Sequence, residues 1–178
     1  RSVIDACLEH MPTLSAGAFD DARTEVVIVD GVKYMAESSA QTFDVILIDS
    51  TDPIGPGEVL FTESFYEDCK RCLAPGGILV TQNGVPFFQP DEVTTTYQRL
   101  TPLFADVSFY FTVVPTYVGG FMALGWATDD ASLREVSVQD LWARFEAAGF
   151  SSDYYTPEVH KAAFDLPPFV GKLMRTQS

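Results

Sequence analysis

The sequence predicts an α/β fold: a mostly parallel sheet covered by helices on both faces, with an antiparallel hairpin near the C-terminus. Continuous apolar runs of strand length alternate with helical patterns through residues 1–104, which is typical of a parallel sheet. Two later strand-like runs, 107–113 and 121–127, are separated by a segment too short for a helical crossover. With 178 residues, 47% of them hydrophobic, the chain is expected to form one domain over residues 1–178.

The first part of the chain supplies the parallel strands and their helices. Apolar residues with helical spacing open it: Val3, Ile4, Cys7, Leu8 and Met11. The expected buried strands are short apolar runs, many of their residues β-branched: 25–29, 44–48 and 78–82. The expected helices are amphipathic: 32–37, 62–73 and 91–104. Turn residues separate these elements, and Pro53 prevents the second strand from continuing within the sheet.

The last part of the chain has a different pattern. Residues 107–113 and 121–127 should pair as an antiparallel hairpin, because only residues 114–120 connect them. A helix is expected over 138–148, and a last short helix begins at Pro157, since proline is favoured in the first helical turn.

Charge and cysteine content limit the function classes. The 11 Lys and Arg residues against 25 Asp and Glu give a net charge of −14, and no basic patch is present. Such a surface repels nucleic acid and attracts a cationic small molecule, although acidity that merely aids solubility explains the composition equally well. No apolar run is long enough to span a membrane, and no signal peptide opens the chain.

Three cysteines cannot all pair within one chain, which indicates a reducing, cytoplasmic location. Cys69 and Cys72 have the spacing of a redox motif. They also share one helical face with Phe65 and Leu73, so buried, unreactive thiols are the preferred interpretation. The chain begins at Arg1 inside a helical pattern, and we therefore expect it to be a piece of a longer polypeptide, incomplete at its N-terminus.

The strongest functional signal is Asp49-Ser50-Thr51-Asp52-Pro53, directly after the apolar run 43–48. Ligands of open α/β sheets bind outside the carboxyl ends of the strands. Two carboxylates three positions apart in a loop can converge on one point, so this segment is suited to hold a cation. A simple turn explains either aspartate alone, since Asp favours turns. It does not explain the whole run together with the Pro/Gly loop that follows.

Two further segments are weaker candidates. Asp30-Gly31 also ends a predicted strand and is suited to contact adenine or ribose, or else Asp30 is an ordinary helix N-cap. Tyr117 lies in a Gly-rich turn, where an aromatic face favours alkyl and ammonium groups, or else it is a surface tyrosine of a hairpin. His10 and His160 have no metal-ligand spacing around them, so we expect no metal.

These residues resemble a known family. Residues 49–58 together with Leu60-Phe61 closely resemble the signature of the spermidine synthase (polyamine aminopropyltransferase) family. Pro115-Thr116-Tyr117 before a Gly-containing turn resembles its second substrate segment, and residues 154–164 resemble the C-terminal stretch of its bacterial members. The resemblance covers essentially all of residues 1–178.

The resemblance implies a methyltransferase-like (Rossmann-like), doubly wound domain, which family members precede with a small β-domain. It implies transfer of an aminopropyl group from decarboxylated S-adenosylmethionine to putrescine, giving spermidine and 5′-methylthioadenosine without a metal or prosthetic group. The family's usual dimers imply a homodimer or higher homo-oligomer for the full-length protein.

The resemblance also implies roles for individual residues, of which Asp49 is the expected general base. The residues expected at the diamine are Asp49, Ser50, Thr51, Asp52, Tyr117 and Gln82. The residues expected at decarboxylated S-adenosylmethionine are Asp30, Gly31 and Pro56.

One departure from the family affects the expected activity. The Gly-rich loop, the strand-end acidic residue and the N-terminal residues that complete both sites in the family are absent from residues 1–178. We therefore predict that this chain alone binds its co-substrate poorly and turns over weakly or not at all.

Two other functions remain open. An S-adenosylmethionine-dependent methyltransferase would use the same fold, but it has no general need for an acidic pair, and product identity distinguishes it. A non-catalytic polyamine-binding fragment would bind putrescine without turnover, even when the missing segment is restored.

Overall fold

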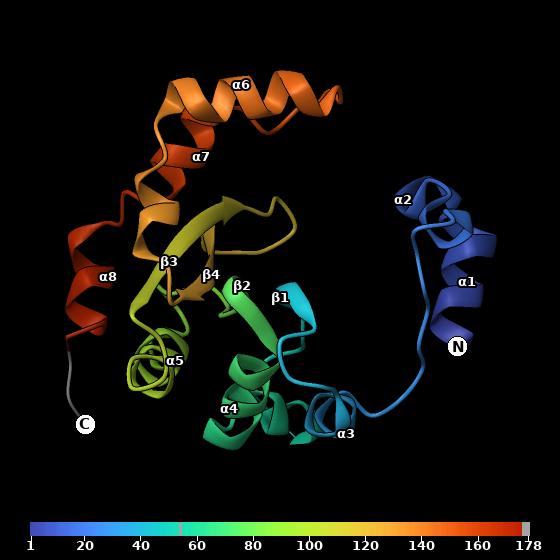
Figure 1. Cartoon of the computed structure of the whole chain (residues 1–178), viewed down its shortest axis with the longest axis horizontal. Helices are drawn as coiled ribbons and strands as arrows, with labels where there is room; N and C mark the ends of the chain where they lie inside the picture. The colour runs from blue at the N-terminus through green and yellow to red at the C-terminus, as the bar shows by residue number, and fades with distance from the viewer. Residues whose placement is uncertain (54, 176–178) are drawn as a thin grey trace.

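A sheet of four strands forms the centre of the molecule in this computed structural model, which describes residues 1–53 and 55–175, with the backbone alone for Pro56. The strands are β1 (Phe43–Ile48), β2 (Leu73–Gln82), β3 (Asp106–Val113) and β4 (Phe121–Thr128), and their order is β1-β2-β4-β3. β1 is parallel to β2, whereas β4 is antiparallel to both of its neighbours (Figure 1). The predicted α/β class and hairpin are confirmed.

Helices cover one face of the sheet along its length. The segments on or beside this face are α3 (Gly31–Glu37), η2 (Gly55–Phe61), α4 (Glu63–Cys72) and α5 (Pro90–Leu100). Strand alternation directs Ile46 and Ile48 of β1 toward this layer, where they pack on the main core. Thr62 caps the N-terminus of α4, and its hydroxyl accepts a hydrogen bond from the backbone N–H of Phe65 at 3.3 Å.

Within residues 1–53 and 55–175, helices cover the opposite face only on its β3–β4 half. The segments after the hairpin are η3 (Ala131–Glu135), α6 (Val138–Ala148), α7 (Pro157–Ala163) and α8 (Pro168–Leu173). α7 contacts β3, and Phe164 just after it lies against Tyr110 and Trp126. α8 packs instead against α5. Beyond the reach of α7, Leu47 on β1 is 70% exposed.

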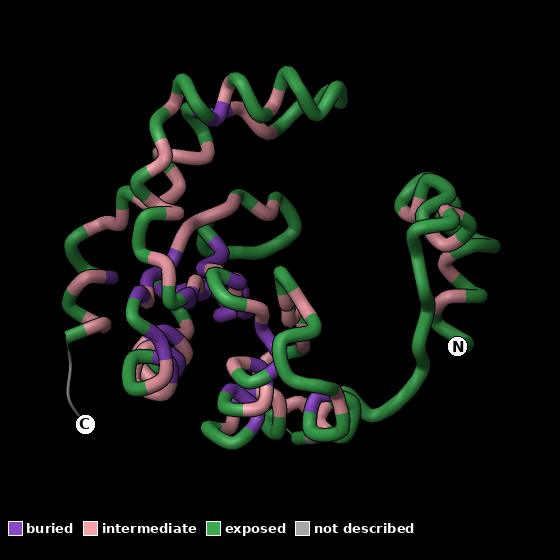
Figure 2. Tube along the Cα trace, in the orientation of Figure 1, coloured by how far each residue is buried: buried purple, intermediate pink, exposed green. Residues whose placement is uncertain are grey.

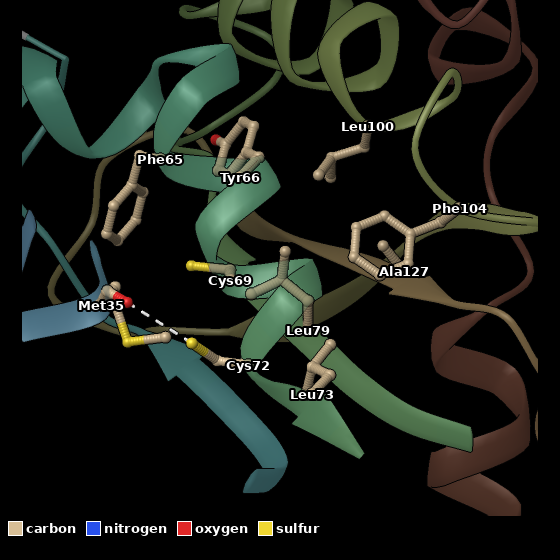
Figure 3. Packing of buried hydrophobic residues seen from close by; sticks show 10 residues of the cluster. All are labelled: Met35, Phe65, Tyr66, Cys69, Cys72, Leu73, Leu79, Leu100, Phe104 and Ala127. Carbon is tan, nitrogen blue, oxygen red and sulfur yellow. Dashed lines mark hydrogen bonds between the residues drawn. The ribbon is translucent and has the colours of Figure 1, made fainter. Parts of the chain in front are cut away.

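The main core lies between the sheet and α4, where buried residues concentrate in Figure 2. Figure 3 shows its members, among them Cys69 and Cys72, which are fully buried and unpaired. The Cys72 thiol donates to the carbonyl of Met35 at 3.4 Å. The interpretation of this cysteine pair as core residues of one helix face is confirmed.

The predicted strand over residues 25–29 is wrong. These residues run as an extended, exposed segment outside the sheet, between α3 and the N-terminal helices α1 (Ser2–His10) and α2 (Pro12–Ser15) (Figure 1). Val26 to Val29 favour strand structure, but a strand also needs a neighbour for its backbone groups, and no strand of the described chain lies beside this run. The expected mostly parallel sheet is reduced accordingly to the single parallel pair β1–β2.

The remaining predicted elements are present with small shifts at their ends. The helix predicted over 91–104 ends at Leu100, and the strand predicted over 78–82 begins at Leu73. α8, a short helix that starts at Pro168, was not predicted from the sequence. None of the helices in the described part of the chain is long and apolar enough to cross a bilayer.

Candidate active site

β1 and β2 end together at one edge of the sheet, which brings two predicted site residues together. Their parallel register pairs Ile48 with Thr81, so Asp49, directly after β1, follows beside Gln82, the last residue of β2. This carboxyl-end edge is where open α/β sheets bind ligands. The topology therefore brings together a carboxylate and a carboxamide that are far apart in sequence.

A pocket of about 390 Å³ opens at this edge. Its polar lining comes from Asp49, Gln82, Tyr110 and Tyr117. Its apolar lining is Leu47, Ile48, Val80, Val114, Met122 and Leu124. A few polar groups on an otherwise apolar wall suit an organic cation with an alkyl chain.

Tyr117 reaches the pocket from the turn between β3 and β4. The turn is held locally by a hydrogen bond from the Tyr117 N–H to the carbonyl of Val114 at 3.0 Å. The Tyr117 side chain is half exposed, whereas Tyr110, on β3, is partly buried. Burial raises the pKa of Tyr110, so its hydroxyl stays protonated near neutral pH.

Two polar groups near this edge have no hydrogen-bond partner among the described residues. Gln82 is only 5% exposed, and its Oε1 atom is unsatisfied. The Ser50 hydroxyl is also buried without a partner. A buried acceptor left unpaired costs free energy, so such a group commonly marks a place that a ligand donor completes. The ammonium of a diamine supplies donors of this kind.

Asp52 lies three residues beyond Asp49 but does not line the same pocket. Its Oδ2 atom accepts a hydrogen bond from Nε2 of Gln89 at 3.0 Å. The same nitrogen donates to Oε1 of Glu92 at 2.7 Å. The predicted convergence of Asp49 and Asp52 on one point is therefore not seen, and Asp52 belongs to a network with α5.

The loop that carries these residues folds back on itself. Thr51 is exposed, and a Cβ atom at Gly57 would lie 2.5 Å from the Thr51 hydroxyl and 3.0 Å from the Asp52 carbonyl. Only glycine fits this approach, which explains its place in the loop. The side chain of Pro56 lies outside the described residues, so its role stays a prediction.

Asp30 caps the first turn of α3. Its carboxylate accepts a hydrogen bond from the backbone N–H of Lys33 at 3.0 Å, so the N-cap alternative is observed. Asp30 and Gly31 are exposed, and α3 contacts η2, the segment that follows Asp52. The structure therefore places the predicted adenine-contacting pair next to the loop of the diamine residues. Their contact with a ligand stays a prediction.

Sequence reasoning missed Gln89 and Glu92. Burial raises the pKa of Glu92 to about 7; the negative charge of Asp52 also raises it, while the hydrogen bond from Gln89 lowers it. A usable signal was present, because Gln89-Pro90-Asp91-Glu92 follows β2 at the same edge as Asp49.

No group of three or more side chains suited to a metal ion occurs within residues 1–53 and 55–175.

A sequence model of the spermine/spermidine synthase domain matches residues 1–138, more than half of the chain. The chain belongs to the spermine/spermidine synthase family. Curated relatives in this family include the polyamine aminopropyltransferase of Ruegeria sp. (strain TM1040), 57% identical over 96% of this chain and 60% of the relative. The polyamine aminopropyltransferase of Salmonella arizonae (strain ATCC BAA-731 / CDC346-86 / RSK2980) is 50% identical over 98% of this chain and 61% of the relative.

Solved structures of the family support the fold. A spermidine synthase in complex with the transition-state analogue AdoDATO superposes with a TM-score of 0.87 at 32% identity. The spermidine synthase of Thermotoga maritima superposes with a TM-score of 0.84, also at 32% identity. Each match covers 97% of this chain but only 58% and 57% of those chains, respectively. The chain thus spans about 60% of the length of the spermine/spermidine synthase relatives that it matches.

Proposed function

We propose that this chain carries the catalytic half of a polyamine aminopropyltransferase. The whole protein would transfer an aminopropyl group from decarboxylated S-adenosylmethionine to putrescine, giving spermidine and 5′-methylthioadenosine. The names of the curated relatives and the AdoDATO complex of a structural neighbour support this reaction class. The observation that carries the proposal is the pocket in which Asp49, Gln82 and Tyr117 meet, with Gln82 Oε1 left unpaired.

The reaction requires a neutral amine. A primary ammonium resembling that of lysine has a pKa of about 10.4, so its deprotonation at pH 7 costs ~4.6 kcal/mol. The sulfonium charge of the co-substrate and a partly dry pocket both lower the pKa of the amine. Asp49 then accepts the proton as the bond forms. The amine nitrogen bonds to the carbon next to sulfur, the C–S bond breaks, and the sulfonium becomes a neutral thioether.

The other site residues would bind and orient the two substrates. Gln82 Oε1 would accept a hydrogen bond from the attacking amine, and Tyr117 would lie along the alkyl chain. Asp52, with Ser50 and Thr51, would hold the distal ammonium in place. Asp30 and Gly31 would contact the adenine of decarboxylated S-adenosylmethionine, and Pro56 would pack near its adenosyl group.

The remaining parts of the proposal concern the setting of the whole protein. It would work in the cytoplasm as a homodimer or higher homo-oligomer, on a small diamine and without nucleic acid or membrane partners. It would need neither a metal nor a prosthetic group, because the sulfonium already provides a good leaving group. The net charge of −14 supports the steering of a dication toward the site.

The deciding experiment measures spermidine and 5′-methylthioadenosine by mass spectrometry, with putrescine and decarboxylated S-adenosylmethionine as substrates. It compares the 178-residue chain with the same chain preceded by the N-terminal part of the Ruegeria relative. We expect transfer by the longer protein, and weak or no transfer by the chain alone. In the longer protein, Asp49→Asn should lower kcat by ~10²–10⁴-fold.

A matched control replaces an exposed aspartate, Asp153→Asn, which should leave the rate unchanged. Putrescine binding without transfer by the longer protein would overturn the enzymatic proposal in favour of a binding module. Methyl transfer from S-adenosylmethionine would instead identify a methyltransferase.

A further inference from the structure

Three side chains next to the candidate diamine site form one hydrogen-bonded unit, the Asp52–Gln89–Glu92 network. Gln89 Nε2 donates to Asp52 Oδ2 at 3.0 Å and to Glu92 Oε1 at 2.7 Å. Gln89 Oε1 accepts from the backbone N–H of Val85 at 2.9 Å. The partners fix the orientation of the amide, because carboxylates only accept and a backbone N–H only donates. Gln89 therefore links the two acids in one defined geometry.

Glycine makes room for this network. Gly84 has a φ of +62°, and a Cβ atom there would lie 2.6 Å from Gln89 Oε1 and 2.9 Å from Glu92 Oε2. A side chain at position 84 would therefore displace both groups. Gly84 follows β2 two residues after Gln82, so the network occupies the same sheet edge as the pocket.

Glu92 is the unusual member. Its Oε2 atom is buried without a partner among the described residues, and its pKa lies near 7 because of burial and the adjacent charge of Asp52. Other groups also lie near Glu92. Its negative charge contributes to the raised pKa of Tyr66 on α4. Glu58 of η2 and Asp91 and Arg99 of α5 line a pocket together with Glu92. At neutral pH, the Glu92 carboxyl group is therefore only partly ionised.

A diammonium ligand would change that balance. If the proposed function is correct, an ammonium group is placed near Asp52, and a nearby positive charge favours the ionised form of a carboxyl group. Glu92 is close enough to Asp52 for its titration to depend on that residue's charge. Protonation of Glu92 then becomes less favourable, so its proton leaves to solvent as the cation binds.

We propose that Gln89 and Glu92 are positioning residues for Asp52: Gln89 fixes the direction of its carboxylate, and Glu92 releases a proton to solvent when a diamine binds. This inference rests on the proposed diamine site. It makes the affinity for the diamine rise with pH through the neutral range, because the ionised network carries the larger negative charge.

The test is a carbon-13 NMR titration of the side-chain carboxyl groups, with putrescine as the probe, on the 178-residue chain preceded by the N-terminal part of the Ruegeria relative. Glu92→Gln identifies the Glu92 resonance by its loss, and Glu146→Gln, an exposed residue of α6, is the matched control. Without putrescine, the Glu92 midpoint should lie near pH 7. With saturating putrescine it should fall by about one pH unit, a tenfold coupling.

A second variant tests Gln89. Gln89→Leu removes the donor shared by the two acids, so the Glu92 midpoint should rise and the putrescine affinity should fall about tenfold. The melting temperature, measured in parallel, should stay within a few degrees of the parent. A fold defect alone would lower that temperature and would not raise the midpoint.

The outcomes separate the two proposals. A Glu92 midpoint near its ordinary value of 4.5 in the free chain overturns this inference alone. A Glu92 midpoint that does not change with putrescine, while the Asp49 resonance does, also overturns it. An unchanged putrescine affinity in Gln89→Leu overturns it as well. If putrescine changes no resonance at all, the diamine site itself is contradicted, and the inference fails with it.

Discussion

Asn83 donates a hydrogen bond from Nδ2 to the Thr96 hydroxyl at 2.7 Å, and both residues are almost completely buried. Asn83 Oδ1 accepts from the hydroxyl of Thr81 and the backbone N–H of Gly125, at 2.7 and 3.0 Å. One carboxamide thus joins the end of β2 to β4 and α5. It directly follows Gln82, so it also fixes the backbone that presents the site residue.

Replacing Thr96 should destabilise the fold. Thr96→Val leaves the Asn83 amide without its acceptor in a buried place, which should lower the free energy of unfolding by about 1–3 kcal/mol. Thr101→Val, an exposed position just after α5, is the matched control and should change it by less than ~0.5 kcal/mol. Urea denaturation measures both values. Equal stability of the two variants would contradict a structural role for the Asn83 network.

Replacing Gln82 should weaken putrescine binding without destabilising the fold. Gln82→Leu removes the unpaired buried Oε1, so the free energy of unfolding should stay unchanged or rise by about 1 kcal/mol. The putrescine affinity should fall at least about tenfold, because the ammonium loses an acceptor. Calorimetric titration and urea denaturation of the same sample provide both numbers. A variant that loses stability and keeps its affinity would show that Gln82 is structural.

The ion pair of Asp106 and Arg134 should make stability depend on acid pH. Arg134 Nε donates to Asp106 Oδ2 at 2.7 Å, and this hydrogen bond holds the pKa of Asp106 below its ordinary value of 3.8. A lowered pKa stabilises the fold above pH 3.8, and this contribution is lost as the pH falls through the lower folded value.

Arg134→Gln should therefore cost about 2–3 kcal/mol at pH 7 and much less near pH 2. The loss leaves the Asp106 carboxylate, which is 8% exposed, with Trp126 Nε1 as its remaining side-chain donor among the described residues. Arg144→Gln, an exposed position of α6, is the control. Denaturant midpoints across that pH range measure the difference. If the difference in stability between parent and variant stayed constant at acid pH, it would contradict the link between this ion pair and the pH dependence of stability.

Cys69 and Cys72 should be unreactive in the folded chain. Burial raises the pKa of Cys69 to about 12 and also raises that of Cys72, so little thiolate is present at neutral pH. Cys7 is partly exposed and should react first with iodoacetamide. Intact mass should show one modified cysteine in native buffer and three in guanidinium. Fast native labelling at either buried position would revive the redox interpretation.

The sequence pattern correctly predicted those elements that depend on residues close together in the chain. The apolar run that becomes β1 and the short 114–120 connection each specify their element, and Asp49 follows a strand whose end is visible in the sequence. The strand predicted over residues 25–29 is absent because apolar residues indicate only a preference for strand structure, whereas a sheet requires a neighbouring strand. Gln89 and Glu92 were missed because their contact with Asp52 depends on packing across distant segments.

The position of β4 between β2 and β3 has a consequence for synthesis of the chain. β2 can pair with β1 as soon as residue 82 has left the ribosome, but its other edge stays open until β4 ends at Thr128. During this interval the nascent chain presents unpaired backbone groups from an inner strand of its sheet. Such an edge invites pairing with other chains. The yield of native protein should therefore depend on how quickly residues 83–128 follow, and on chaperones that cover the edge until they do.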